Sequence, residues 1–274
     1  MLIDTHCHLD AAEFAADRGA IVTAARVAGV SAMLIPAVET ANFPAVRDCC
    51  LHYPECYPAY GLHPLYLDHA SDADLATLRR WLRDELDGAM PPVAVGEIGL
   101  DFYAPDFDAA NQQSFFVEQL KIARDFDLPV LLHVRRAVDQ VLKGLRQIGV
   151  KRGIAHAFNG SRQQADELIR LGFKLGFGGA MTYPGSTRIR KLAGTLPIDA
   201  IVLETDAPDI PPCWLAGGRN TPAELPRIAD ILAELRGVSS AKIHAATSAN
   251  ARTLWSSSAA EQAADHHAAS PGAK

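Results

Sequence analysis

Residues 153–178 read GIAHAFNGSRQQADELIRLGFKLGFG, and this stretch decides the fold class. Two short, mostly apolar segments, 153–157 and 173–178, flank residues 161–171, where apolar side chains recur at helical spacing. Ser161 is a typical residue to cap the start of that helix. Strands that are apolar on both faces are typical of a parallel sheet covered by helices on both sides. The stretch therefore predicts a strand–helix–strand unit of an α/β protein.

The same alternation recurs along the rest of the chain. Strands are expected at residues 2–6, 32–37, 57–62, 92–97, 129–133, 153–157, 173–178 and 200–204. Helices are expected at residues 13–28, 71–87, 112–126, 136–148, 161–171, 221–236 and 239–254. Thr221 as N-cap, Pro222 as first helical residue and Glu224 as capping-box acid mark the start of the sixth of these helices. About eight repeats of strand and helix predict a (β/α)8 TIM barrel, with a doubly wound open sheet as the alternative.

The length and composition fit one large domain followed by a tail. The chain has 274 residues, of which 49% are hydrophobic and 21% are charged, and this is enough for a complete barrel. We expect residues 1–255 to form that barrel. Residues 256–274 are rich in Ala and Ser and lack apolar periodicity, so we expect a disordered tail in which His266 and His267 bind no metal.

The composition also disfavours several classes of protein. No apolar run approaches the ~20 residues that cross a bilayer, and the N-terminus lacks the pattern of a signal peptide. The five cysteines fit neither a disulfide framework nor a zinc motif, so we expect a cytoplasmic protein without membrane association or an obligatory protein partner. The net charge of −6 argues against a broad nucleic-acid-binding surface but allows a small basic patch.

The first ten residues, MLIDTHCHLD, place two histidines one residue apart. On a strand, residues i and i+2 point to the same side, so His6 and His8 would be neighbours and Cys7 would point to the opposite side. Two adjacent neutral imidazoles are half of a metal site. The motif alone is equally consistent with a polar strand end.

Ionisable residues also stand at the ends of four later expected strands, namely Glu97, His133, His156 and Asp206. In a barrel, the C-terminal strand ends converge on the face that carries the active site. Each residue has an ordinary structural explanation of its own, such as a hydrogen-bonded core histidine or a helix-capping acid. Burying all of them together without a cation would leave their charges poorly compensated, so the set predicts a metal centre.

The six predicted metal ligands are His6, His8, Glu97, His133, His156 and Asp206. Their nitrogen and oxygen atoms suit zinc, manganese, iron or magnesium. Because a carboxylate has two oxygens, Glu97 is placed to bridge two divalent ions. The first two histidines and Asp206 would hold the more buried ion, and the other two histidines the second. Such a pair lowers the pKa of a shared water, and Asp206 is expected to take the proton of that water as general base.

These residues belong to an ordered series of motifs. The motifs are DTHCHLD at 4–10, GLHP at 61–64, GEIGLDF at 96–102, Q-x2-F-x2-QL at 113–120, LPVLLHVRRA at 128–137, HAFNGS at 156–161, LETDAP at 203–208, RN-x-P at 219–222 and SANARTLW at 248–255. Over residues 1 to about 255 the chain resembles the TatD-type metal-dependent hydrolases of the amidohydrolase superfamily. The resemblance implies a divalent-metal hydrolase with the six ligands named above. It also implies phosphodiester substrates, since these proteins are usually described as deoxyribonucleases, often 3′→5′ exonucleases on single strands.

The resemblance leaves alternatives for the activity. Many superfamily relatives carry a carboxylated lysine where this sequence has Glu97, which disfavours a dihydroorotase-like or urease-like reaction. A second hypothesis is a metal-dependent amide or ester hydrolase, such as a deacetylase or an aminoacyl-tRNA deacylase. A third is a binding module without enzymatic activity, in which the metal has a structural role.

A phosphodiester substrate needs hydrogen-bond donors near the metal centre. His63 follows the third expected strand, and Arg135 lies two residues beyond His133 on the same side, so we expect both to bind phosphate. Tyr103 is expected to stack on a base of a single-stranded DNA.

Other residues have less direct roles in this prediction. Arg136 is expected to face away from the site, Phe158 to pack in the core, and Glu204 to orient a ligand histidine. A basic rim for the DNA strand would form if the later cationic residues cluster, and these are Arg162, Arg188, Arg190, Lys191 and Arg219. A solvated helix face is the alternative for residues 188–191.

Overall fold

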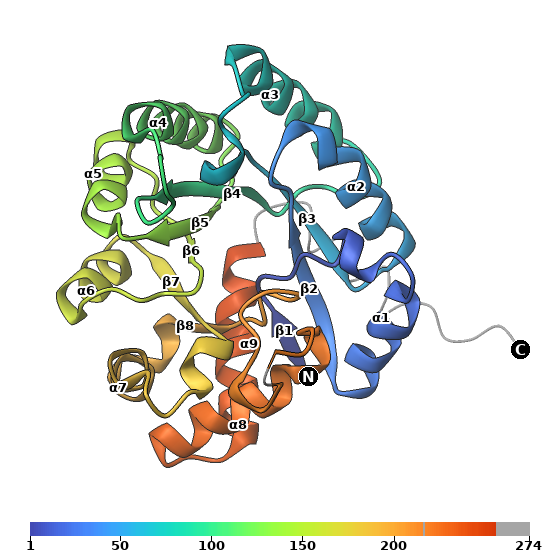
Figure 1. The fold of residues 1–274 in the computed structure, drawn as a ribbon, viewed down its shortest axis with the longest axis vertical. Helices are drawn as coiled ribbons and strands as arrows, with labels where there is room; N and C mark the ends of the chain where they lie inside the picture. Colours follow the sequence, from blue (N-terminus) through green and yellow to red (C-terminus); the bar gives the residue numbers. More distant parts are fainter. Residues whose placement is uncertain (216, 256–274) are drawn as a thin grey trace, which may run out of the picture.

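A computed structural model describes residues 1–215 and 217–255 of the chain. Its sheet has eight parallel strands, and their spatial order is their order in the sequence (Figure 1). The strands are Leu2–Asp4 (β1), Val30–Pro36 (β2), Cys56–Tyr60 (β3), Ala94–Asp101 (β4), Val130–Arg135 (β5), Gly153–Ala155 (β6), Phe173–Phe177 (β7) and Ile201–Leu203 (β8). This is the order of the predicted TIM barrel, whereas a doubly wound sheet reverses its strand order.

The barrel closes through the segments that follow its first and last strands. The backbone N–H of Thr5 donates to the carbonyl oxygen of Leu203 at 3.0 Å. Further along, His8 N–H donates to the carbonyl oxygen of Ala207 at 2.8 Å, and Cys7 and Ala207 form a parallel bridge. These contacts bring β1 and β8 side by side at the end where the strands finish.

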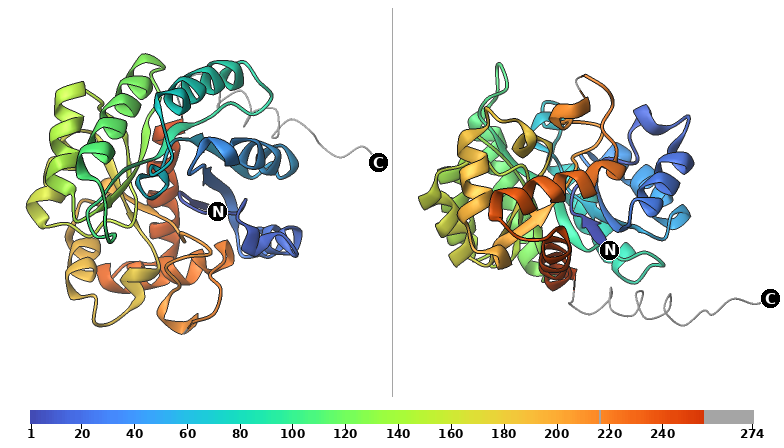
Figure 2. Two further views of the ribbon diagram at one scale, coloured as in Figure 1. Left: turned by 45° about the horizontal axis from the view of Figure 1, so that its top comes forward. Right: turned by 90° about the horizontal axis from the view of Figure 1, so that it is seen from below.

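Helices surround the sheet (Figures 1 and 2). The α-helices are Arg18–Val27 (α1), Phe43–His52 (α2), Asp72–Leu86 (α3), Ala109–Asp125 (α4), Val138–Ile148 (α5), Arg162–Arg170 (α6), Thr187–Thr195 (α7), Leu225–Arg236 (α8) and Ser240–Trp255 (α9). Short 3₁₀ helices lie at Ala12–Phe14 (η1), Thr40–Asn42 (η2), Pro64–Tyr66 (η3), Gly179–Thr182 (η4), Ile198–Ala200 (η5), Cys213–Leu215 (η6) and Pro222–Glu224 (η7). At the start of α6, Ser161 is the N-cap, as predicted, and it forms a capping box with Gln164.

The last helix, α9, covers the end of the barrel at which the strands begin. Its Ser248 hydroxyl donates to the carbonyl oxygen of Met1, and Asn250 Nδ2 donates to the carbonyl oxygens of Ile198 and Ile201 next to β8. Its apolar residues join a buried cluster with inward-facing strand residues, namely Ile3, Ala32, Leu34, Ala59, Val93, Ala94, Leu131, Ile154, Val202, Ala251 and Leu254. Because this end is covered, the opposite end of the barrel is the one available for a functional site.

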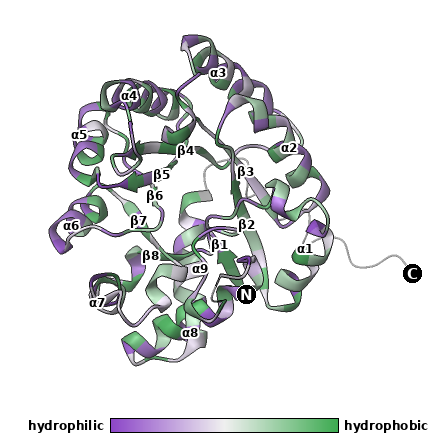
Figure 3. Ribbon diagram, viewed as in Figure 1, coloured by the Kyte–Doolittle hydropathy of each residue, from purple (hydrophilic) through white to green (hydrophobic). Residues whose placement is uncertain are grey.

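A second apolar layer fills the space between the strands and the outer helices. Cys7 and Phe158 are both buried in this layer, as predicted. Figure 3 shows the same arrangement, with hydrophobic strands and with helices that alternate between hydrophobic and hydrophilic faces. Burial on both faces explains why the strands read as nearly continuous apolar runs.

Two helices are absent from the sequence prediction. The first, α2, contains Pro44 and the adjacent Cys49 and Cys50, and the second, α7, contains Gly194. Cysteine and glycine have low helix propensity, so the sequence pattern inside both helices is weak, whereas Pro44 lies in the first turn of α2, where proline is tolerated.

Many predicted elements begin or end at other residues, and β4, for example, continues to Asp101, although that strand was expected to end at residue 97. The expected helix 13–28 is divided into η1 and α1, and the expected helix 221–236 begins as the 3₁₀ helix η7, so that α8 starts only at Leu225. Pro222 begins η7, and Pro226 lies in the first turn of α8. Strand β1 ends at Asp4, so His6 and His8 lie beyond the strand, in the segment that bonds to β8.

The predicted tail, with His266 and His267, lies outside the described residues, and the domain boundary at residue 255 stays a prediction. Among the described helices, none is both long and apolar enough to span a lipid bilayer.

Candidate metal centre

The predicted ligands meet on the floor of an open cavity at the C-terminal ends of the strands. The cavity has a volume of about 1390 Å³. Its lining includes five of the six predicted ligands, namely His8, Glu97, His133, His156 and Asp206. The sixth, His6, is fully buried directly beneath them. The three residues predicted to bind substrate, His63, Tyr103 and Arg135, also line this cavity.

Two glycines of the GEIGLDF motif allow β4 to bring Glu97 into the site. A Cβ atom on Gly96 would lie only 2.5 Å from the Cβ atom of Leu131, and a Cβ atom on Gly99 would collide with the carbonyl oxygen of His133. Gly99 also has a φ of +151°, which L side chains rarely adopt. These glycines let β4 and β5 approach closely, and the site residue between them turns toward the barrel axis.

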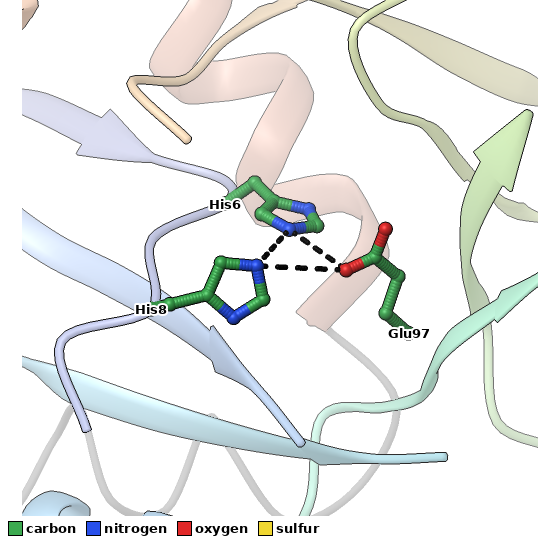
Figure 4. Close-up of side chains that lie close together, drawn as sticks. All are labelled: His6, His8 and Glu97. Carbon is green, nitrogen blue, oxygen red and sulfur yellow. Dashed lines mark hydrogen bonds and ion pairs between the residues drawn. The ribbon is translucent and has the colours of Figure 1, made fainter. Parts of the chain in front are cut away.

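Glu97 lies at the centre of the cluster, and its two carboxylate oxygens face different histidines. Its Oε2 atom is 3.1 Å from His6 Nε2 and 3.6 Å from His8 Nε2 (Figure 4). Its Oε1 atom is 2.9 Å from His133 Nδ1 and 3.2 Å from His156 Nε2. The carboxylate is therefore oriented between two histidine pairs, and its bridging of two metal ions stays a prediction.

Asp206 completes the first of these two sets. Its Oδ1 atom is 3.4 Å from His6 Nε2 and 3.8 Å from His8 Nε2. The two imidazole nitrogens are themselves 3.1 Å apart. His6 and His8 thus point at each other although the strand ends before them, because the bonds to the segment after β8 fix the backbone of this segment.

The sequence analysis missed Asp101, which holds His133 from behind. Its Oδ2 atom is 3.0 Å from His133 Nε2, and its Oδ1 atom accepts hydrogen bonds from the backbone N–H groups of Tyr103 and Ala104. A carboxylate behind a histidine fixes the ring orientation and tautomer of a metal ligand. The available signal was the position of this acid within the GEIGLDF motif, four residues after Glu97.

Glu204 occupies the corresponding position beside His156. Its Oε1 atom is 3.6 Å from His156 Nδ1 and accepts a hydrogen bond from the backbone N–H of Ala157 at 2.5 Å. Gly176 makes room for it, since a Cβ atom there would overlap the Glu204 carboxylate. Glu204 thus lies beside His156 without a hydrogen bond between the two side chains, and its role in orienting that histidine stays a prediction.

His63, which was predicted to bind substrate, lies within the cluster of predicted metal ligands. Its Nδ1 atom accepts a hydrogen bond from the backbone N–H of Leu65, and its Nε2 atom is 3.4 Å from Glu97 Oε1. Together with Glu97 and His133 it forms one of three overlapping sets of ligand atoms, each set lying within 4.8 Å. The other two sets are His6, His8 and Glu97, and His6, His156 and Asp206.

The charges in the cluster fit a cation. Burial lowers the pKa of His6 well below its usual value and raises the pKa of Asp206 to about 7. Burial also acts to raise the pKa of Glu97, but the surrounding imidazoles outweigh it and hold that pKa well below the usual range. The fully buried His6 Nδ1 has no hydrogen-bond partner among the described residues. Converging imidazole nitrogens around buried carboxylates are a donor set that a divalent cation satisfies.

Arg135 and Tyr103 are in contact at the edge of the cavity. The guanidinium carbon of Arg135 lies 3.8 Å from the centre of the Tyr103 ring, and that of Arg136 lies 4.4 Å from it. The prediction that Arg136 faces away is therefore wrong. Arg136 has a φ of +56°, and this left-handed backbone breaks the alternation of strand side chains directly after β5.

The predicted basic rim forms only in part. Arg188 lines the cavity and donates to Asn159 Oδ1 at 2.7 Å. Three other arginines have partners elsewhere, since Arg162 bonds to Asp166, Arg190 to the carbonyl oxygen of Met181, and Arg219 to Asp17.

Comparison with known proteins agrees with this geometry. Residues 3–256 match the family model described as TatD related DNase. The chain belongs to the TatD family. It is 40% identical over 254 residues to the uncharacterized metal-dependent hydrolase YjjV of Escherichia coli K12, covering 92% of this chain and 97% of that protein. The crystal structure of this TatD homologue superposes with a TM-score of 0.89 at 39% identity, covering 94% of this chain and 98% of the other.

A more distant TatD relative carries a specific activity in its name. The protein named 3′-5′ ssDNA/RNA exonuclease TatD, from Escherichia fergusonii, is 31% identical over 261 residues. The match covers 93% of this chain and 98% of that protein. Among the relatives compared, those of higher similarity are named metal-dependent hydrolases, and the exonuclease name belongs to more distant ones.

Proposed function

We propose that this member of the TatD family of metal-dependent hydrolases is a phosphodiesterase that removes nucleotides from the ends of single-stranded DNA in the 3′→5′ direction. The observation that carries the proposal is the position of Glu97, whose two oxygens face two separate histidine pairs at 2.9–3.6 Å. Two neighbouring divalent ions are the usual arrangement for hydrolytic displacement at phosphorus. The name of the exonuclease relative supports the substrate class.

The proposed ligands divide between two ions. His6, His8 and Asp206 would hold the first, His133 and His156 the second, and Glu97 would contact both. We propose zinc, magnesium or manganese as the metal, because mixed nitrogen and oxygen donors suit these ions to different degrees. Bound there, divalent ions would lower the pKa of a water molecule and neutralise charge on the attacked phosphate.

The residues of the chain supply the proton transfer and the binding of the strand. Asp206 takes a proton from the attacking water as the water oxygen bonds to phosphorus. The bond between phosphorus and the departing sugar oxygen breaks, and Asp206 returns the proton to that oxygen. Arg135 offers paired donors for a phosphate oxygen, His63 offers a further donor, and the half-exposed ring of Tyr103 offers a stacking surface for a base.

A substrate panel tests the proposal. Metal-free protein is reconstituted separately with Mg²⁺, Mn²⁺ and Zn²⁺ and given single-stranded DNA, an aryl phosphodiester, an N-acetylated amine and an aminoacyl ester. We expect turnover of the DNA and the phosphodiester. If both stay intact while the amide or the ester is hydrolysed, the protein is the alternative amide or ester hydrolase. If no substrate turns over while the metal binds, the metal has a structural role.

A further inference from the structure

The two halves of the cavity mouth carry opposite charges. Carboxylates line the half formed by the loops after β8, β1 and β2, and these are Asp10, Glu13, Glu39 and Asp209. Guanidinium groups line the half formed by the loops after β5 and β7, and these are Arg135, Arg136 and Arg188. Figure 1 shows α1 and α2, which follow the loops after β1 and β2, on the right, and α5 and α7 on the left, whereas α8, which follows the loop after β8, lies beside α7. Because β8 adjoins β1, each group of loops occupies one side of the mouth.

The acidic half keeps its charge available to a bound molecule. Tyr66 lies near these carboxylates and is about half exposed. Its pKa is raised by partial burial and by the negative charges of Glu39, Asp209 and Glu13. None of the three side chains has an ion pair with Lys or Arg in the described part of the chain. The nearby Arg219 is bound to Asp17 and to the backbone carbonyl of Glu13.

The basic half combines positive charge with an aromatic surface, and Arg135 also lies 4.0 Å from the buried Asp101 carboxylate. Arg135 and Arg136 are exposed and contact the ring of Tyr103, which is itself 49% exposed. A carboxylate in this half, Asp139, is occupied as the acceptor of a hydrogen bond from Gln164 Nε2 at 2.8 Å. A nucleic-acid backbone therefore meets cations and a stacking ring on this side only.

We propose that the cavity takes a nucleic-acid strand in one orientation, with its phosphates along Arg135, Arg136 and Arg188 and its terminal nucleoside against Glu13 and Glu39. In this orientation the protein cuts a strand end that carries a free hydroxyl and rejects the same end when it carries a phosphate. This inference rests on the proposed nuclease function and adds the selection of the strand end to it.

Charge explains both parts of the selection. A terminal nucleoside is neutral, and its hydroxyl and base N–H groups are donors that carboxylates accept. A terminal phosphate monoester carries about −1.5 to −2 at pH 7, so carboxylates beside it repel it. A strand that continued through the acidic half would place further phosphates against the same carboxylates. The acidic half thus excludes an internal segment as well as a phosphorylated end, which restricts cleavage to ends.

Four labelled single-stranded oligonucleotides of one sequence test the inference, two with a hydroxyl or phosphate at the 3′ end and two with a hydroxyl or phosphate at the 5′ end. Cleavage is measured with Mn²⁺, and binding to metal-free protein is measured by fluorescence anisotropy in EDTA. At the end that is attacked, we expect the oligonucleotide with a terminal hydroxyl to be cut at least fivefold faster than the one with a terminal phosphate, and to bind more tightly. We expect this preference to shrink in 1 M salt, where charges are screened within about 3 Å.

A charge-matched pair of double variants separates the local effect from net charge. The Glu13→Gln/Glu39→Gln variant should bring the hydroxyl-to-phosphate ratio close to one. The Asp84→Asn/Glu234→Gln variant changes the net charge equally at exposed positions on α3 and α8 and should keep the wild-type ratio. Arg136→Gln should weaken binding of both end types while the ratio is retained.

The outcomes distinguish this inference from the function on which it rests. Equal cleavage of hydroxyl and phosphate ends, or an unchanged ratio in Glu13→Gln/Glu39→Gln, would overturn the inference and leave the nuclease proposal standing. Absence of DNA cleavage with every metal would overturn both. Cleavage within a circular single strand would also overturn the inference, because a circle has no end to place against the acidic half.

Discussion

The backbone N–H of Asp206 donates to the carbonyl oxygen of His6 at 2.8 Å. This bond joins the segment after the first strand to the segment after the last, and the side chains of the same two residues lie 3.4 Å apart in the metal centre. Directly beneath them, the buried Asp4 carboxylate accepts hydrogen bonds from the backbone N–H and the hydroxyl of Thr205 at 2.9 and 2.5 Å. The contacts that close the barrel are therefore the contacts that assemble the first ligand set.

Replacing Asp4 tests this link between closure and metal binding. Asp4→Ala leaves the buried backbone N–H and hydroxyl of Thr205 without their acceptor, and such a loss costs about 1–3 kcal/mol for each donor. We expect the free energy of unfolding, measured in urea, to fall by about 3 kcal/mol. Divalent-metal affinity should fall with it, and the exposed Asp84→Ala should change neither quantity. Loss of stability with unchanged metal affinity would contradict the link.

Metal binding itself should stabilise the fold. A ligand that binds only the folded state at a hundred times its dissociation constant adds about 2.7 kcal/mol of stability. We expect Zn²⁺ or Mn²⁺ to raise the melting temperature of metal-free protein and elemental analysis to find two ions per chain. The His6→Ala/His8→Ala variant should stay folded, lose activity and bind one ion. A stoichiometry of one ion in the wild-type protein would contradict the bridging role of Glu97.

The barrel could be predicted because burial on both faces gives its strands a simple pattern. Runs such as residues 129–133 and 173–178 are largely apolar, and the polar residues that follow several of the strands mark the C-terminal face. α2 and α7 could not be predicted in this way because cysteine and glycine weaken their local signal. Tertiary packing, rather than propensity, makes these segments helical.

Four of the six expected ligands, namely His6, His8, His156 and Asp206, lie just beyond strand ends, and a parallel barrel brings those ends together. Glu97 and His133 join them from within β4 and β5, which continue past these residues. Asp101 and Arg136 were beyond this reasoning. Asp101 ends β4 and acts behind His133, but the sequence pattern predicted that this strand ends at residue 97, so Asp101 was not counted among the strand-end residues. Arg136 turns into the cavity through a left-handed backbone that strand alternation does not anticipate.

Asp101 should control the second ion without touching it. Asp101→Asn keeps the size of the side chain but replaces a carboxylate oxygen that faces His133 Nε2, and loss of such an orienting acid typically lowers metal affinity or activity about 10–100-fold. We expect the dissociation constant of one ion, measured by competition with a chelator, to rise by this factor. The dissociation constant of the other ion should stay unchanged. Asp106→Asn, an exposed change in the same loop, is the matched control. Equal effects on both ions would show that Asp101 supports the whole site rather than His133.

Gly99 should be the most demanding position in the motif around Glu97. A Cβ atom there would collide with the carbonyl oxygen of His133, and its φ of +151° disfavours any L side chain. We expect Gly99→Ala to lower the free energy of unfolding by about 3 kcal/mol or more and to displace His133, so that the second ion binds weakly. Gly29→Ala is the control that separates backbone strain from collision. Gly29 has a φ of +90°, but a Cβ atom there would have no neighbour within 4 Å. Backbone strain alone should therefore lower the free energy of unfolding by about 1 kcal/mol. If urea unfolding shows the same modest loss for both variants, close packing of β4 on β5 is not what places Glu97.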